Sequence, residues 1–207
     1  MSKGQILIFS GCAGSGKGTV LNYFKKKCDR IFYSVSCTTR AMRPGEIDGV
    51  HYHFKTRREF EDLIQKGEFA EYTEYCGNLY GTPRTPLLSA VEAGKIAILE
   101  IETDGALHMM EQFPAHLSVF IAPPDGKTLE NRLRTRGTET NDVIEKRMTA
   151  ARDEILLACR YQHILINRDG KAENVADALL SLCNGNDDLS DDVTVADTEN
   201  FIRHYFD

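Results

Sequence analysis

Apolar runs alternate with helix-type patterns along the 207 residues of this chain. The apolar runs predict strands, at Gln5–Ser10, Phe32–Ser36, Ile96–Ile101, Leu117–Ile121 and His163–Ile166. Segments with helical spacing lie between these runs and after the last one, at Thr19–Lys27, Glu59–Gln65, Leu87–Ala93, about Gly105–Gln112, Lys127–Arg134, Val143–Tyr161 and Glu173–Cys183. This alternation favours an α/β fold, in which a central parallel sheet carries helices on both faces.

Capping signals mark the ends of two predicted helices. Thr56 is followed three residues later by Glu59, which is the spacing of a capping box, and Gly67 follows the end of that helix. Thr85 and Pro86 predict a cap and a first helical position before the next helix.

The first predicted strand runs into a glycine-rich loop that ends on a lysine. Its glycines free the backbone to point successive N–H groups at one spot, and the helix that follows adds its positive N-terminal end. Lys17 adds a point charge for the outer phosphates. Strand, loop and helix together are typical of a P-loop that binds a nucleoside triphosphate, and they disfavour a glycine-rich turn without function. The loop residues are Gly11, Cys12, Ala13, Gly14, Ser15, Gly16, Lys17, Gly18 and Thr19.

Two positions of this loop lead to further predictions. Gly18 follows Lys17 where Ser or Thr is usual, and the hydroxyl comes one residue later, so we expect Thr19, with water, to serve Mg²⁺. Cys12 lies inside the loop, where nearby positive charge would lower the pKa of its thiol.

Composition narrows the class of protein. The formal net charge of −6 disfavours nucleic acid as a partner. The sequence has no apolar stretch of membrane-spanning length and no signal-peptide pattern, so we expect no membrane partner and a cytoplasmic location. The six cysteines form no C-x-x-C pair, which argues against a zinc or redox motif.

A second group of polar residues follows the second predicted strand. Arg40 and Arg43 lie close to Tyr52, and this combination suits a second phosphate. Glu71 supplies a carboxylate that accepts hydrogen bonds from adjacent N–H donors, which guanine presents on N1 and N2 and adenine does not. Any one of these residues alone is equally typical of a solvated loop. As a spaced set they favour a nucleotide-binding lobe inserted into the fold.

A third group is basic and lies before and within the longest predicted helix. Arg132 and Arg136 are four residues apart and share a helix face, Gly137 begins a flexible break, and Arg147 follows on the next helix. Without the P-loop, a basic helix pair on the surface would be the simpler interpretation. With it, these arginines are candidates for contact with the triphosphate.

From residue 3 to about residue 183 the chain resembles the guanylate kinases. The motif from Ser36 to Phe54 is the distinctive part, and the Gly-Lys-Gly-Thr spelling of the P-loop also fits. The resemblance implies a P-loop NTPase three-layer fold with a guanylate kinase domain at 1–183. In it the core spans 1–33, 95–125 and 150–183, the GMP-binding lobe 34–94 and the mobile lid about 126–149. It also implies ATP as phosphoryl donor, Mg²⁺, and GMP as acceptor, with the use of dGMP left open.

The resemblance further implies roles for single residues. Ser36, Glu71 and Thr82 would hold the guanine base, and Glu102 would serve the base or the metal shell. Asn167 would line the adenine pocket. The GMP phosphate would be held by Arg40, Arg43, Tyr52 and Tyr80. The residues that would act on the transferring phosphoryl group are Lys17, Arg43, Arg132, Arg136 and Arg147.

The chain departs from the family pattern at two motifs. Where the family usually reads Asp-Ile-Asp-x-Gln-Gly, this chain has Glu100, Glu102 and Asp104, so both acids are one methylene longer and a further negative charge is present. Arg168 interrupts the family's Asn-Asp-Asp ending.

Several questions stay open at this point. Residues 184–207 form an acidic extension whose end, Glu199–Phe206, docks back, contacts another subunit or frays. A kinase for another small acceptor is one alternative function. A binding module that has lost catalysis is another, although such modules typically lose the P-loop lysine or the lid arginines, which this chain keeps. The sequence does not predict the oligomeric state.

Overall fold

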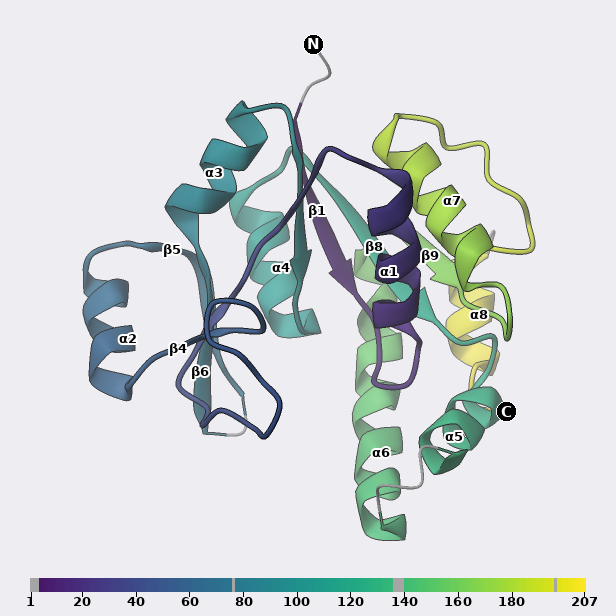
Figure 1. The fold of residues 1–207 in the computed structure, drawn as a ribbon. Coiled ribbons are helices and arrows are strands. Elements are labelled where there is room, and N and C mark those ends of the chain that lie inside the picture. The colour runs from purple at the N-terminus through teal and green to yellow at the C-terminus, as the bar shows by residue number, and fades with distance from the viewer. Residues whose placement is uncertain (1–3, 76, 136–139, 196) are drawn as a thin grey trace. The chain divides into compact units, whose positions relative to one another are not determined.

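The computed structural model describes residues 4–75, 77–135, 140–195 and 197–207 (Figure 1). Its central sheet has five strands in the order β2-β7-β1-β8-β9. These strands are β1 (Gln5–Ser10), β2 (Ile31–Tyr33), β7 (Ile96–Glu100), β8 (His116–Ala122) and β9 (His163–Ile166). β2 pairs with β7, and β8 with β9, in parallel. The predicted α/β fold with a parallel central sheet is confirmed.

The seven predicted helices occur as α1 to α7, with shifted bounds, and the structure adds the 3₁₀ turn η1 and the C-terminal helix α8, which the spacing did not predict. They are α1 (Lys17–Lys27), α2 (Arg57–Gln65), α3 (Arg84–Glu92), α4 (Thr103–Gln112), α5 (Gly126–Thr135), α6 (Asn141–Leu157), η1 (Ala158–Arg160), α7 (Ala172–Cys183) and α8 (Thr198–His204). The predicted capping box of α2 is confirmed, because Thr56 Oγ1 accepts from the Glu59 N–H and Glu59 accepts from the Thr56 N–H. Gly67 follows with φ at 68°, a left-handed conformation that suits glycine.

Three predicted boundaries are wrong by three residues or more, and the predicted cap at Thr85 is wrong as well, because Pro83 is the N-cap of α3. α3 begins at Arg84, because the Arg84 N–H is already satisfied by the Glu68 carbonyl at 2.8 Å and the helix starts directly from β6. Pro86 then lies in the first turn, where its missing N–H costs no helical hydrogen bond. β2 ends at Tyr33, before the predicted Ser36. α6 ends at Leu157, and the remaining predicted residues form the 3₁₀ turn η1.

The chain divides into two compact units. Unit 1 comprises Met1–Ile8 and Arg30–His116, and unit 2 comprises Phe9–Asp29 and Leu117–Asp207. Unit 1 contains a second sheet in the order β4-β3-β6-β5. Its strands are β3 (Cys37–Thr38), β4 (His53–Phe54), β5 (Phe69–Tyr75) and β6 (Asn78–Pro83).

A small core holds α2 against this second sheet. Phe60 of α2 stacks on Phe69 of β5 with ring centroids 4.5 Å apart, and Cys37 and Leu79 complete the buried cluster. β5 and β6 form an antiparallel hairpin, in which Glu71 lies opposite Thr82. The core therefore fixes the register of the hairpin, and the register decides which polar side chains face each other.

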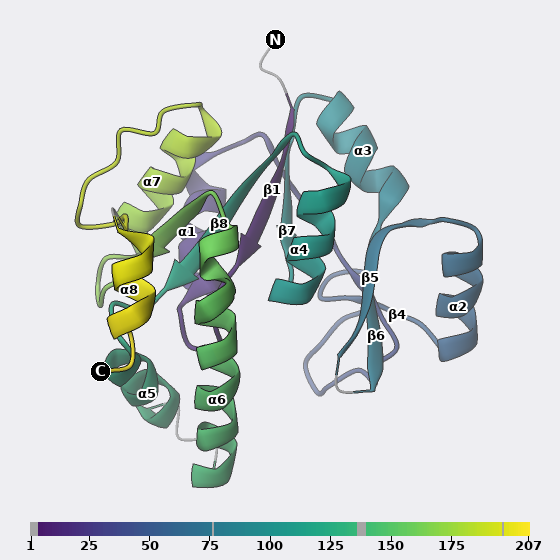
Figure 2. The same cartoon turned by 180° about the vertical axis from the view of Figure 1, so that it is seen from behind.

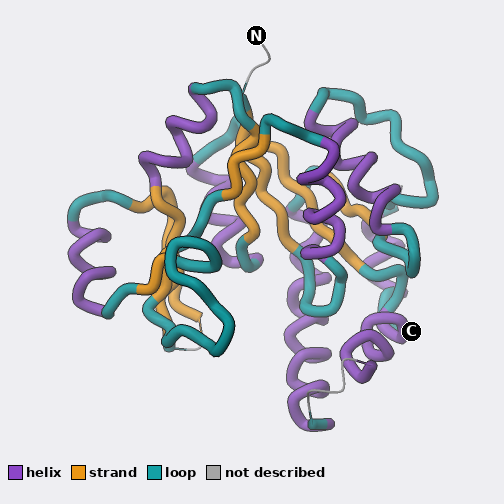
Figure 3. The backbone as a smooth tube through the Cα atoms, viewed as in Figure 1, coloured by secondary structure: helices purple, strands orange, loops and turns teal. Residues whose placement is uncertain are grey.

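In unit 2, helices cover both faces of the strand pair β8 and β9. α1 and α7 lie in front of it in Figure 1, and α6 and α8 lie in front when the molecule is turned in Figure 2. Lys27 of α1 bonds Asp177 at 2.6 Å and Glu173 at 3.0 Å, both on α7. The tube in Figure 3 shows the loop that connects β1 to α1. Across the described ranges, no helix is both long enough and apolar enough to cross a membrane.

Candidate active site

The loop between β1 and α1 in unit 2 has a backbone that only glycine can supply at two points. Gly16 has φ at 87°, and a Cβ there would lie 2.3 Å from Asn167 Nδ2. A Cβ at Gly11 would lie 2.2 Å from the Ile121 carbonyl oxygen. Gly16 is also the N-cap of α1, so the loop delivers the positive end of that helix. This is the geometry that anion binding at a helix N-terminus requires.

Lys17 folds back over the loop that precedes it. Its ammonium group donates to the carbonyl oxygen of Gly11 and, at 3.3 Å, to that of Cys12. Because both partners are neutral acceptors, an incoming phosphate can replace them with a stronger charge-assisted bond. The arrangement fits the role that we assign to Lys17, which stays a prediction.

The thiol of Cys12 contradicts its predicted activation. The residue is fully buried, and this burial raises the pKa of the thiol to about 12, outweighing the opposing effect of Lys17. The expected lowering of the pKa is therefore wrong, because the loss of solvation exceeds the attraction of the nearby positive charge. At neutral pH the thiol stays protonated and packs as a small apolar group.

A cavity of about 560 Å³ opens beside this loop within unit 2. Thr19, the expected magnesium ligand, faces it from α1 and is exposed. The wall opposite comes from α5 and from the segment after β9. The lining residues are Gly14, Gly16, Thr19, Thr128, Asn131, Arg132, Thr135, Asn167, Arg168, Asp169, Gly170 and Ala172.

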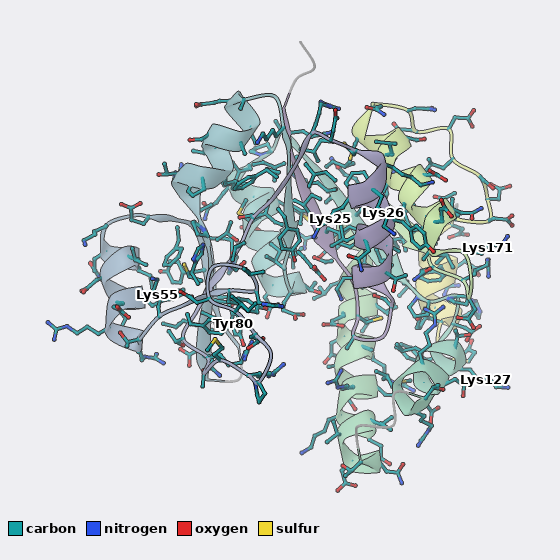
Figure 4. The ribbon with its side chains drawn as sticks, viewed as in Figure 1. Lys25, Lys26, Lys55, Tyr80, Lys127 and Lys171 are labelled. Atoms are coloured by element: carbon teal, nitrogen blue, oxygen red, sulfur yellow. The ribbon has the colours of Figure 1, made fainter. Side chains whose placement is uncertain are left out.

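Arg132 on α5 is held against the phosphate loop. Its Nη2 donates to Asp169 Oδ1 at 2.6 Å and to the Asn167 carbonyl at 2.7 Å, and its Nε donates to the same Asp169 oxygen at 3.1 Å. Its Nη1 lies 3.5 Å from the Ser15 carbonyl oxygen. Arg134, which the resemblance leaves out, bonds Glu130 instead. Lys127, also on α5, points outward in Figure 4.

Asn167 connects the end of β9 to the same loop. Its side chain is 5% exposed, and Nδ2 donates to the Ser15 carbonyl at 2.8 Å. Asn167 Oδ1 and Ser15 Oγ are both buried, and neither has a hydrogen-bond partner among the described residues. Buried polar atoms without a partner are costly, so these two suit a polar ligand, as ATP would be.

Of the two other arginines predicted to act on the transferring phosphoryl group, Arg147 and Arg136, only Arg147 lies in the described residues. Arg147 is half-buried on α6. Arg136 falls outside the described residues, so its predicted role is not tested.

In unit 1, Glu71 and Thr82 form a buried pair across β5 and β6. Thr82 Oγ1 donates to Glu71 Oε1 at 2.7 Å. Thr82 is 0% exposed and Glu71 is 5% exposed. Burial raises the pKa of Glu71, although the bond from Thr82 opposes this. Gly105 on α4 makes room beside it, since a Cβ there would lie 3.0 Å from Glu71 Oε2. The result is a preformed acceptor for paired N–H donors.

Arg40 is fixed by two parallel hydrogen bonds to one carboxylate. Its Nη1 and Nη2 donate to Glu46 at 3.0 and 2.7 Å, and Glu46 also accepts from the Arg43 N–H at 2.7 Å. Hydrogen bonds from Arg40 and from the Arg43 backbone lower the pKa of Glu46 to about 2. The side chain of Arg43 is exposed. Sequence reasoning gave Glu46 no role, although an acid six residues after an arginine was a signal.

Aromatic rings surround this guanidinium. The Tyr52 ring centroid lies 5.4 Å from Arg40 Cζ and 6.0 Å from the Tyr80 ring, which Figure 4 places on the second sheet. Ser36 lies at the edge of the same sheet, where its carbonyl accepts from the His53 N–H at 2.8 Å. The structure thus gathers Arg40, Tyr52 and Tyr80 as the sequence predicts.

The acids that replace the family pattern have different environments. Glu100 accepts from the Tyr33 hydroxyl at 2.7 Å. Glu102 is the exposed N-cap residue of α4, and Asp104 follows in the first turn. Burial raises the pKa of Tyr52, and the charges of Tyr80, Glu102 and Glu100 raise it further, while Arg40 lowers it. Glu102 therefore acts electrostatically on a residue assigned to the acceptor phosphate.

Metal-binding clusters of the usual protein ligands do not occur in the described ranges, where no three His, Cys, Asp or Glu side chains gather. Thr19 offers a hard hydroxyl oxygen, the ligand type that Mg²⁺ prefers alongside water and substrate phosphates. The site therefore fits a magnesium ion that arrives with its nucleotide rather than one held by a protein cage.

Comparison with known proteins agrees with this geometry. The family model described as guanylate kinase matches residues 3–181. The guanylate kinase of Halalkalibacterium halodurans is 47% identical over 165 residues, 80% of this chain and 81% of that protein. The guanylate kinase of a Nostoc species is 43% identical over 169 residues, 82% of this chain and 85% of that protein. The crystal structure of guanylate kinase from Anaplasma phagocytophilum has a TM-score of 0.71 and 30% identity, covering 98% of this chain and 95% of that one. By sequence and by fold, this chain belongs to the guanylate kinase family.

Proposed function

We propose that this protein transfers the γ-phosphoryl group of ATP to GMP and releases ADP and GDP. The observation that carries the proposal is the buried Glu71–Thr82 pair, which presents a carboxylate suited to the N1 and N2 donors of guanine. Family membership supports the same reaction class.

The donor nucleotide is assigned to unit 2. Backbone N–H groups of the loop and Lys17 hold the β- and γ-phosphates, and the loop around Asn167 takes the adenine end. Thr19 and water would hold Mg²⁺, which when bound offsets charge on the phosphate oxygens. Asn167 Oδ1 and Ser15 Oγ, both buried, support a polar ligand at this place.

The acceptor is assigned to unit 1. Arg40, Arg43, Tyr52 and Tyr80 hold the GMP phosphate, and the bidentate bond from Arg40 to Glu46 keeps that arginine in position. Ser36, Thr82 and Glu71 hold the base. The charge of Glu102 contributes to the raised pKa of Tyr52, and we assign Glu102 to the base or the metal shell.

The chemical step needs alignment and charge stabilisation rather than covalent help. An oxygen of the GMP phosphate forms a bond to the γ-phosphorus, and the bond to the bridging oxygen of ADP breaks. No general base is required, because the attacking oxygen is already ionised. Lys17, Arg132, Arg136 and Arg147 stabilise the charge on the transferring group, and Arg43 offsets repulsion between the two phosphates.

A coupled ADP-release assay with Mg-ATP and each monophosphate in turn tests the proposal. Rapid turnover with GMP, and little with AMP, UMP or CMP, is the expected result. Turnover with a different acceptor would contradict the assignment of Glu71 to guanine, but it would not affect the assignment of the phosphate loop to ATP. GMP binding without turnover would instead favour a binding module. A cytoplasmic location is proposed together with this reaction.

A further inference from the structure

The C-terminal extension, residues 184–207, lies beyond the residues matched by the family model and packs back onto unit 2. The Ile166 N–H of β9 donates to the Val193 carbonyl at 2.9 Å, and Leu165 pairs with Thr194 in an isolated antiparallel bridge. Val193 is 6% exposed and Tyr205 is 2% exposed. The described residues of the extension are therefore an ordered part of this unit, and the prediction that the segment docks back is confirmed.

One contact of the extension reaches the wall of the nucleotide cavity. Arg168, which replaces the family's aspartate, lines that cavity, and its Nε donates to the Asp192 carbonyl at 3.3 Å. The residue that departs from the family pattern is thus paired with the segment that the family model leaves unmatched.

A second contact holds the first residue of α5. The Gly126 N–H donates to the Tyr205 carbonyl at 2.7 Å. This N–H is one of the helix-start donors that have no partner inside the helix, so Tyr205 supplies what the helix lacks. A Cβ at Gly126 would lie 2.5 Å from Phe206 Cδ1 and 3.1 Å from the Tyr205 carbonyl oxygen. Gly126 therefore fits against the C-terminus with no room for a side chain.

Phe206 also contacts α6, the helix whose first half belongs to the predicted lid. Arg152 Cζ on α6 lies 4.6 Å from the Phe206 ring centroid, which is cation–π distance. The C-terminus lies beside α5 in both Figure 1 and Figure 2. Phe206 thus bridges α5, which carries Arg132, and α6, which carries Arg147.

The buried end of Tyr205 points to the same neighbourhood. Burial raises the pKa of its hydroxyl, the Asp125 carboxylate raises it further, and the Arg132 guanidinium lowers it. Asp125 immediately precedes α5, and Arg132 lies on that helix. The residue therefore lies close to the parts that would hold the triphosphate.

We propose that Tyr205 and Phe206 are positioning residues for the donor nucleotide, because they fix the start of α5 and so hold Arg132 against the phosphate loop. The inference rests on the proposed function, since it assigns the triphosphate to Arg132 and the loop. It predicts an effect confined to the donor side, because the contacts of the extension described here lie within unit 2.

The test compares Phe206→Ala with Arg203→Ala, an exposed position on α8, in the full-length chain. We expect Phe206→Ala to raise the KM for ATP by about tenfold, the effect of losing one close contact, and to leave the KM for GMP unchanged. We also expect Phe206→Ala to speed up amide hydrogen exchange in α5. Arg203→Ala should change neither the KM for ATP nor the exchange in α5. A variant with unchanged KM for ATP and unchanged exchange in α5, or with both KM values raised equally, would overturn the proposal.

Two further measurements separate this inference from the proposed function and from simple misfolding. Calorimetric binding of a non-hydrolysable ATP analogue needs no acceptor, so weaker binding by Phe206→Ala supports the inference even if the wild-type chain fails to turn over GMP. Gly126→Ala disturbs the same contact from the side of α5. The double variant Gly126→Ala with Phe206→Ala should therefore lose less affinity for the ATP analogue than the product of the two single losses. Independent, multiplicative losses would contradict the contact as the cause. Thermal unfolding confirms that each variant is folded.

Discussion

The phosphate loop of unit 2 and the acceptor cluster of unit 1 hold their positive charges in different ways. Lys17 donates to backbone carbonyls, and Arg132 donates to the Asn167 carbonyl and to one oxygen of Asp169, whose side chain is 83% exposed. Arg40 instead bonds both carboxylate oxygens of Glu46, and only 14% of the Arg40 side chain and 16% of the Glu46 side chain are exposed. The donor-side cations are therefore held by partners that a phosphate can replace, whereas Arg40 is fixed before any ligand arrives.

This difference matches the two tasks. A triphosphate brings its own charge and a metal ion, so the donor side needs cations that can exchange partners. A monophosphate must be aligned for attack, so the acceptor side gains from groups already held in place. If the two units responded alike to the loss of one such interaction, this difference between them would not hold.

The largest effect is expected for Lys17→Ala. Removing the charge that stabilises the transferring group should lower kcat by about a hundredfold or more. Steady-state assays with saturating ATP and GMP measure this. Lys26→Ala, on the outer part of the same helix, is the control and should keep normal turnover. Near-normal kcat in Lys17→Ala would remove this residue from the mechanism.

Arg43→Ala is expected to lower kcat by about a hundredfold as well, because its exposed side chain has an acceptor phosphate as its assigned partner. Arg58→Ala, an exposed arginine on α2, matches the change in charge without touching the acceptor cluster. Equal effects in the two variants would mean that the loss reflects net charge and not alignment.

Glu46→Gln should loosen Arg40 and raise the KM for GMP by about tenfold, while the KM for ATP stays unchanged. The same variant changes the acid dependence of stability. The pKa of Glu46 is lowered to about 2, so the stabilisation from this pair is present above the ordinary pKa and is lost as the pH falls toward 2. Thermal unfolding between about pH 5 and pH 2 should therefore be steeper for the wild type than for Glu46→Gln. Parallel curves would show that the ion pair does not stabilise the fold.

The smallest effect is expected for the stability of Glu71→Gln at neutral pH. Because burial raises the pKa of Glu71, the folded state binds more protons than the unfolded state, and stability falls as the pH rises past the ordinary pKa. A glutamine carries no charge, so it avoids the cost of burying a carboxylate, and its amide oxygen still accepts from Thr82. The midpoint of thermal unfolding should therefore rise by about 2–4 °C at pH 7. At pH 4 the gain should shrink. A lower midpoint at pH 7 would mean that the charge of Glu71 stabilises the fold.

The two units also differ in how much of each could be predicted from the sequence. β1 and β9 have the predicted bounds, and the phosphate loop was visible because its chemistry depends on neighbours in the chain. The pair of Glu71 and Thr82 depends on the hairpin of β5 and β6, which the apolar pattern did not predict. Short, half-buried strands with polar residues on one face carry a weak pattern, and their register comes from packing against Phe60.

Other details were beyond sequence reasoning for similar reasons. The pKa of Cys12 depends on how completely the fold buries it, which no local pattern reveals. The partner of Arg168 lies 24 residues away along the chain, in the extension. The start of α3 follows from a hydrogen bond between Arg84 and Glu68, which are distant in sequence but adjacent in the hairpin. Contacts of this kind appear only once the chain has folded.

The role of Glu71 in guanine recognition is tested most directly by comparing GMP with IMP, which lacks the 2-amino group, as acceptors for the wild type and for Glu71→Gln. If Glu71 accepts the paired N–H donors of guanine, the wild type should prefer GMP by about tenfold or more in kcat/KM, because an unmade bond to a buried charged group is costly. Glu71→Gln should lose most of this preference. An equal preference in both proteins, or no preference in the wild type, would contradict the assignment of Glu71 and with it the proposed acceptor.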